Sequence, residues 1–198
     1  ILIAFKMKFW NIGAEGQIYM GAFLGSFFAL KFPNAPKGLL IPIMILAGIV
    51  GGGLYGLIPA FFKGKYDTNE TLFTLMLNYI AIKWVTYLQY GPWKDPSANG
   101  FPKIATFSDN ATLPKLLGIN IGWVIAIILV ILVHIFIHNT KKGYEIEVIG
   151  ESENTARYAG INVSRTIMEA MFLSGGLCGL AGIIQASGVN NTLSVELS

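Results

Sequence analysis

Uninterrupted apolar segments, each about as long as a bilayer is thick, are the feature that most constrains this chain. Apolar residues fill whole segments of about twenty residues, rather than one stripe of a helix or alternate positions of a strand. Composition agrees, because 54% of the residues are hydrophobic and 13% are charged, whereas soluble domains carry roughly 25% charged residues. The sequence therefore predicts an all-α fold, a polytopic transmembrane helix bundle in lipid.

Five segments are predicted to span the membrane: 12–30, 39–62, 71–90, 120–138 and 166–187. Most lysines and arginines between them fall in alternate connections, which the positive-inside rule places in the cytoplasm. We therefore expect one transmembrane domain over residues 1–198, with an extracellular loop at 91–119 and a cytoplasmic loop at 139–165. Since the chain begins at Ile1 rather than Met, we expect that domain to be incomplete.

Small residues recur at helical spacing within the predicted spans, which allows helix backbones to approach closely. We interpret as helix-packing positions the glycines Gly21 and Gly25, Gly48, Gly52 and Gly56, and Gly175 and Gly179. Residues 51–56 also match G-x-G-x-x-G, but a dinucleotide site requires a strand before that motif. Packing is therefore the preferred interpretation.

Polar side chains interrupt the apolar pattern at two places. Asn11, Glu15 and Gln17 come immediately before an apolar run, and Asn78 continues a polar face of the third predicted span. Such groups are costly in hydrocarbon, so they turn toward other helices or toward a wet pathway. Asn11 is also a suitable helix N-cap, and Glu15 suits the first turns of a helix. A substrate pathway and interhelical hydrogen bonding both remain open.

Other reactive side chains indicate no catalytic or metal site. His134 and His138 lie four apart, as metal ligands can, but further ligands are missing nearby. Cys178 is the single cysteine, which excludes a disulfide framework, and there is no basic stripe for nucleic acid. Lys83 lies well inside the third span, where it either reaches the outer interface or faces a carboxylate or wet cavity. We expect a protein that is not an enzyme.

The cytoplasmic loop contains the signals of its own short helix. Ser152 can cap a helix over residues 153–159, and Gly160 can end it. Ala156 and Tyr158 offer apolar contact on that helix, which suits docking to a soluble partner.

Five segments together resemble one family, the permease subunits of ABC importers of the branched-chain amino acid, ribose and nucleoside class. They read NIGAEGQ at 11–17, MLNYIA at 76–81, GPWKDP at 91–96, GYEIEVIG at 143–150 and ARYAGI at 156–161. They occur in the family's order and look closest to its nucleoside or simple-sugar branch. Lys83 departs from the pattern, because relatives usually carry an uncharged residue there, and the first and last spanning helices of the family are missing.

The resemblance implies a permease subunit of an ATP-driven importer of nucleosides in the bacterial inner membrane, with simple sugars as the alternative. It would pair with a second permease subunit, couple to cytoplasmic ATPase subunits and receive substrate from an extracellular binding protein or lipoprotein. ATP and magnesium would bind to the ATPase, so we expect no cofactor in this chain. An ion-coupled secondary transporter or channel is the rival class, and an intramembrane metalloenzyme ranks below it.

The resemblance also implies roles for individual residues. The coupling helix that contacts the ATPase would carry Glu153, Ala156, Arg157, Tyr158 and Gly160. The substrate pathway would carry Asn11, Glu15, Gln17 and Asn78, with Tyr79 placed to stack on a base.

Overall fold

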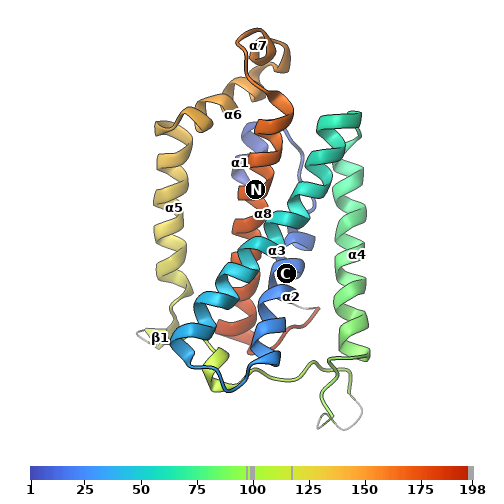
Figure 1. Cartoon of the computed structure of the whole chain (residues 1–198), viewed down its shortest axis with the longest axis vertical. Coiled ribbons are helices and arrows are strands. Elements are labelled where there is room, and N and C mark those ends of the chain that lie inside the picture. The colour runs from blue at the N-terminus through green and yellow to red at the C-terminus, as the bar shows by residue number, and fades with distance from the viewer. Residues whose placement is uncertain (97, 99–100, 117, 196–198) are drawn as a thin grey trace.

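The computed structural model describes residues 1–96, 98, 101–116 and 118–195, and these form a bundle of long helices (Figure 1). The α-helices are α1 (Leu2–Lys6), α2 (Ala14–Lys31), α3 (Lys37–Tyr66), α4 (Glu70–Tyr90), α5 (Gly122–Asn139), α6 (Lys141–Glu151), α7 (Glu153–Tyr158) and α8 (Val163–Gln185). The shorter elements are a 3-10 turn η1 (Asp109–Ala111), an antiparallel hairpin of β1 (Lys115–Leu116) and β2 (Ile119–Asn120), and a π-helical turn η2 (Ala186–Asn190). The predicted all-α transmembrane bundle is confirmed.

Within the described residues, four helices are long and apolar enough to cross a membrane: α3, α4, α5 and α8 continued through η2. They correspond to four of the five predicted spans. The first predicted span, 12–30, is not among them, which corrects the expected number. Its helix α2 begins at Ala14 and carries Glu15 and Gln17 in its first turns. Because α2 packs against α3, α4 and α8, it faces protein on several sides and does not need to be apolar all round.

Glycines allow α2, α3 and α8 to meet at backbone contact distance. A Cβ atom added at Gly52 would lie 2.7 Å from the Cα of Gly179, and one added at Gly48 would lie 3.1 Å from the Gly179 carbonyl oxygen. One added at Gly21 would lie 2.8 Å from the carbonyl oxygen of Gly48. Gly25, Gly56 and Gly175 make similar close approaches across the same three helices. A side chain at any of these positions would have to push two helices apart.

The buried apolar residues form two clusters, one toward each end of the bundle. The α7-end cluster includes Ile3 of α1, Ile146 of α6, Ala156 of α7 and Ile167 of α8. The opposite cluster is built from α2, the first half of α3, the second half of α4, the 104–111 segment and the end of α8. The chain between α1 and α2 passes from one cluster to the other.

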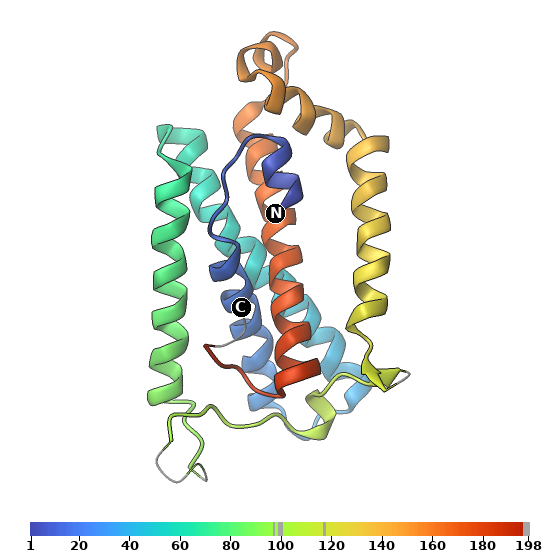
Figure 2. The same cartoon turned by 180° about the vertical axis from the view of Figure 1, so that it is seen from behind.

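The predicted extracellular loop lies against the end of the bundle opposite α7 (Figures 1 and 2). Ile104 and Phe107 are buried there. The Phe107 N–H donates to the carbonyl of Asn191 at 2.8 Å, and the Leu113 N–H donates to the carbonyl of Ser187 at 3.0 Å. These bonds hold the loop to η2 and the segment after it. Residues 97, 99–100 and 117 of the predicted loop lie outside the described residues.

The predicted cytoplasmic connections gather at the other end. Figures 1 and 2 place α6, α7 and the turn between α3 and α4 together there. Lys63 and Lys65 lie in the last turn of α3, and Lys6 in the last turn of α1 pairs with Glu147 of α6. Segments that are far apart in sequence therefore share one basic and acidic surface.

Candidate functional site

The chain between α1 and α2, residues 7–13, is not helical, and alternate residues of it are buried. Met7, Phe9, Asn11 and Gly13 are all buried, and Lys8 has a φ angle of 55°, in the left-handed region. Buried backbone groups outside a helix need hydrogen-bond partners from elsewhere, particularly in a membrane protein. Most of its N–H groups donate to nearby backbone carbonyls, such as that of Phe9 to Ala4, whereas the Gly13 N–H and the Ile12 carbonyl bond to side chains.

Asn78 of α4 bonds both to this segment and to the first turn of α2. Its Oδ1 accepts a hydrogen bond from the Gly16 N–H at 2.7 Å, and its Nδ2 donates to the carbonyl of Ile12 at 2.8 Å. The Gly16 N–H is one of the first-turn groups that have no acceptor within their own helix. The Asn78 side chain therefore caps α2 and also binds Ile12, the residue before the N-cap.

Asn11 and Gln17 complete the polar cluster. The Asn11 Oδ1 accepts from the Gly13 N–H at 3.0 Å, and its Nδ2 donates to the Gln17 Oε1 at 3.2 Å. Both side chains are almost fully enclosed, at 2% and 1% exposure. The expected N-cap role of Asn11 is corrected, because Gly13 is the N-cap and Asn11 bonds to that residue instead. We call Asn11, Gln17 and Asn78 the amide cluster.

The structure does not bring all five predicted pathway residues together. Glu15 is half-buried in the first turn of α2, where the helix dipole favours a carboxylate. Tyr79 is 62% exposed on the outer surface of α4, because consecutive helical residues point about 100° apart. It therefore lies on a different face from Asn78. The amide cluster is occupied by bonds among its own members and with the backbone.

Three residues that sequence reasoning missed, Gly13, Gly16 and Tyr55, hold α4 close to α2 and α3. A Cβ atom at Gly13 would lie 2.9 Å from the Thr74 Cβ, and one at Gly16 would lie 2.9 Å from the Asn78 Oδ1. The Tyr55 hydroxyl of α3 donates to the Leu77 carbonyl of α4 at 2.8 Å. The spacing of Gly13 and Gly16 beside amide residues was the available signal.

The polar face of α4 turns inward along its first half. Thr74 is fully buried, and its hydroxyl donates to the Thr71 carbonyl at 3.2 Å. Glu70 pairs with Lys63 of α3 at 3.2 Å. Lys63 also pairs with Asp67 at 2.8 Å, and this hydrogen bond lowers the pKa of the exposed Asp67 carboxyl. Of these contacts, the Lys63–Glu70 ion pair joins α3 to α4.

The predicted short helix in the cytoplasmic loop is α7, which projects beyond the ends of the long helices (Figure 1). Ser152 is its N-cap and accepts from the Thr155 N–H at 3.3 Å, and Gly160 follows it with a φ of 77°. Ala156 is fully buried, so its apolar contact is with the bundle and not with a soluble partner, which corrects that expectation. Tyr158 is 94% exposed.

The exposed face of α7 also carries charge. Glu153 and Arg157 form an ion pair at 4.0 Å along that face. The side chains that α7 offers to another molecule therefore include these two and Tyr158.

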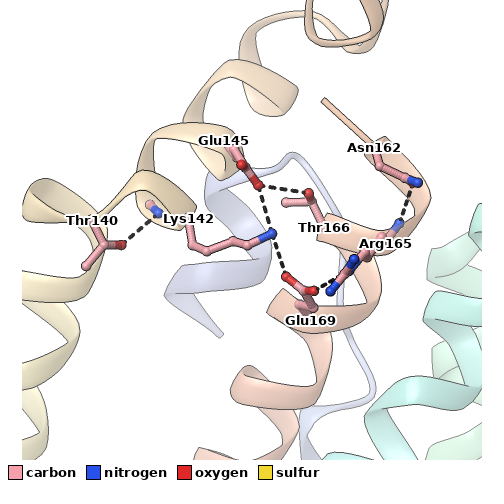
Figure 3. Close-up of polar contacts among 8 residues, drawn as sticks. Thr140, Lys142, Glu145, Asn162, Arg165, Thr166 and Glu169 are labelled. Carbon is pink, nitrogen blue, oxygen red and sulfur yellow. Dashed lines mark hydrogen bonds and ion pairs between the residues drawn. The ribbon is translucent and has the colours of Figure 1, made fainter. Parts of the chain in front are cut away.

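A cluster of ion pairs joins α6 to the start of α8 (Figure 3). Lys142 Nζ lies 2.7 Å from Glu169 and 2.9 Å from Glu145, and Arg165 Nε lies 2.8 Å from Glu169. The Thr166 hydroxyl donates to Glu145 at 3.3 Å. The hydrogen bond from Lys142 to Glu169, and to a smaller extent the one to Glu145, raises the pKa of Lys142, so the Lys142 ammonium stays charged. Lys142–Glu145 and Arg165–Glu169 are local pairs, but Lys142 and Glu169, which join the two helices, are far apart in sequence, so spacing gave no signal for that contact.

The remaining candidate residues lie outside the amide cluster and the ion-pair cluster. Lys83 is exposed on the outer surface of α4, and no described carboxylate lies within ion-pair distance of it. The His138 Nδ1 lies 2.9 Å from the carbonyl oxygen of His134, within the same helix. Among the described residues, no three His, Cys, Asp or Glu side chains gather where a metal could bind. Cys178 is buried in α8.

The sequence of the whole chain is similar to known permeases. It is 32% identical over 201 residues to the "Glucose ABC transporter permease protein TsgB13" of Haloferax volcanii, covering 95% of this chain and 52% of that protein. It is 32% identical over 202 residues to the "Nucleoside ABC transporter permease protein NupB" of Lactococcus lactis subsp. cremoris, covering 94% and 54%. It is 26% identical over 206 residues to the "Guanosine ABC transporter permease protein NupP" of Bacillus subtilis, covering 99% and 57%.

The chain spans about half the length of the curated relatives that it matches. No solved structure matches it significantly. Residues 1–197 match the family described as "Branched-chain amino acid transport system / permease component". Since that match covers almost the whole chain and four of its helices are suited to cross a membrane, the chain is a multi-pass membrane protein that belongs to this family of permease components.

Proposed function

We propose that the chain is part of the transmembrane permease subunit of an ATP-driven importer of nucleosides. The observation that carries the proposal is α7, a short capped helix that stands clear of the membrane-spanning helices and exposes Tyr158 almost completely. Such a projection is suited to contact with a soluble partner. Two relatives named as nucleoside or guanosine permeases support the substrate class.

In this proposal the chain transmits motion and performs no chemistry. ATP and magnesium bind to a separate cytoplasmic ATPase, which contacts Glu153, Arg157 and Tyr158 of α7. Movement of α7 then shifts the spans and alternates access to the substrate, as a population shift between two arrangements. An extracellular binding protein or lipoprotein delivers the substrate at the opposite end, in the bacterial inner membrane.

The outer face of α4 is our proposed border with the second permease subunit and the pathway between the two. The exposed positions in the middle of α5, residues 126–132, are aliphatic, for example Ile127, Val130 and Ile131, as expected against lipid. By contrast, α4 exposes Tyr79 and Lys83 in the middle of its span. A lysine there costs about 3 kcal/mol against hydrocarbon. A wet or protein-covered surface removes that cost.

In this proposal the predicted pathway residues have two different roles. Tyr79 faces the pathway and stacks on a base, whereas Asn11, Glu15, Gln17 and Asn78 lie behind it and fix the start of α2 against α4. Stacking on an aromatic ring contributes about 1–3 kcal/mol per base. Tyr79→Ala should therefore lower nucleoside uptake at least about fivefold, and Tyr144→Ala, an exposed tyrosine of α6, is the matched control.

The test of the whole proposal is reconstitution of the complete permease with its partner subunit, ATPase and binding protein in vesicles. We expect uptake of labelled nucleosides that requires ATP hydrolysis. A simple sugar is the second candidate substrate, since TsgB13 is named as a glucose permease, and uptake of glucose but not of nucleosides would select it. Uptake without the ATPase, driven by an ion gradient, would show a secondary transporter or channel and refute the importer.

A further inference from the structure

Helix α6 is held to α1 as well as to α8. Lys6 Nζ lies 3.0 Å from Glu147 of α6, with the two side chains 35% and 54% exposed. Three residues further along α6, a Cβ atom added at Gly150 would overlap the carbonyl oxygen of Lys6 and lie 3.4 Å from the Met7 Cα. Only glycine permits the two backbones to approach this closely. The end of α1 is therefore fixed to α6 by one ion pair and one backbone contact.

Apolar packing makes α1 part of the same rigid unit as α7. Ile3 and Ala4 of α1 share a buried cluster with Ile149 of α6, Ala156 of α7 and Ile167 of α8. Ala156 is the residue by which α7 enters that cluster. A force applied to α7 therefore acts on α6 and α1 together, since close-packed interiors transmit displacement.

The chain that leaves α1 leads directly to the amide cluster. Lys6 is separated from Asn11 by four residues, of which Met7 and Phe9 are buried in the α7-end cluster. Asn11 then bonds to Gly13 and Gln17, and Asn78 joins this segment to α4. A displacement of α1 has a short route to the contact between α2 and α4, anchored by the buried Met7 and Phe9.

We propose that α1 is a transmission arm, tied to α6 by Lys6, Glu147 and Gly150, that delivers movement of α7 to the amide cluster at the start of α2. This rests on the proposed function of α7 as the coupling helix. The three residues are positioning residues, because they touch neither substrate nor ATPase in this scheme. The covalent path from α7 into α8 is the other route, and the arm adds a second one that reaches α2 and α4.

The test uses the complete permease with two kinds of variant. Glu147→Lys places two ammonium groups together, and Lys6→Glu with Glu147→Lys restores an ion pair of reversed polarity. Gly150→Ala separates the two backbones. The matched controls are Lys31→Glu, at the far end of α2, and Gly38→Ala, where no atom lies within 4 Å of the added Cβ.

Two measurements separate this inference from the proposed function. The first is hydrogen exchange of residues 7–16 in the permease alone, which we expect to accelerate in Glu147→Lys and Gly150→Ala and to return to normal in the double reversal. The second is substrate imported per ATP hydrolysed in the assembled importer. It should fall at least about fivefold in the same variants, the lower end of typical coupling between sites, while ATPase binding stays unchanged.

Unchanged exchange in Glu147→Lys would overturn the arm whatever the importer does. Accelerated exchange with a normal ratio of uptake to hydrolysis would also overturn it, because the contact would then be structural only. Failure of the double reversal to restore either readout refutes the ion pair as the tie. Absence of ATP-dependent uptake by the unmodified complex would refute the proposed function. Hydrogen exchange of residues 7–16 would still test the contact between α1 and α6.

Discussion

Replacement of Asn78 by alanine tests whether the amide cluster holds the bundle together. The change removes the acceptor of the Gly16 N–H and the donor to the Ile12 carbonyl, bonds of 2.7 and 2.8 Å. The Gly16 N–H then lies buried without a partner, which costs about 1–3 kcal/mol, and the part-buried Ile12 carbonyl loses its donor as well. We therefore expect Asn78→Ala to lower the free energy of unfolding by at least about 1–3 kcal/mol. That is a large part of the roughly 5–15 kcal/mol of a typical protein.

The assay is denaturant unfolding of the complete permease in detergent, followed by helical circular dichroism. Tyr79→Ala is the matched control, because it changes the next residue on the exposed face of α4 and should stay within about 0.5 kcal/mol of the unmodified protein. Hydrogen exchange of the Gly16 amide should accelerate in Asn78→Ala alone. If the two variants unfold alike, the amide cluster does not carry the contact between α2 and α4, and our explanation of the interrupted helix is wrong.

Three further predictions concern packing, docking and charge. Gly179→Ala should destabilise the permease by about 1–3 kcal/mol, because its Cβ would overlap the Gly48 carbonyl oxygen, and a normal unfolding curve would show that α3 and α8 can separate freely. Tyr158→Ala should leave unfolding within about 0.5 kcal/mol but weaken ATPase binding in a pull-down, and unchanged binding would remove α7 from the docking surface. Lys142 has a raised pKa, so its stabilising contribution should persist below about pH 10.4, the ordinary lysine value, and disappear as pH rises through the higher folded value. The difference in unfolding between the unmodified protein and Lys142→Met should therefore be equal at pH 7 and pH 9, and a loss by pH 9 would contradict the ion-pair cluster.

Local signals predicted α7 well because its formation depends on neighbouring residues. Ser152 caps the helix through Thr155, three residues on, and Gly160 supplies the left-handed turn after it. The same reasoning missed α6, although its buried Ile146 and Ile149 are three residues apart, because that stretch was taken as part of a charged loop. It also assigned the apolar contact of Ala156 to a soluble partner, since sequence does not show which side of a short helix meets the bundle.

The polar residues before α2 were recognised as special, but their partners were not. Asn78 and Gly16 are 62 positions apart, so no local pattern connects them. The structure decides that the amide groups bond to one another and to the backbone, and that Tyr79 points away from them.

The sequence by itself determined that this chain is an all-α membrane protein, because the length and hydrophobicity of a span are properties of one continuous segment. It also determined the caps of α7 and the family to which the chain belongs. Only the tertiary structure decided that α2 lies among the other helices, that α4 caps it, and that α1 joins α6 to the start of α2. These contacts depend on how helices distant in sequence approach one another, and glycines such as Gly13, Gly16 and Gly150 acquire meaning only when the opposing backbone is known.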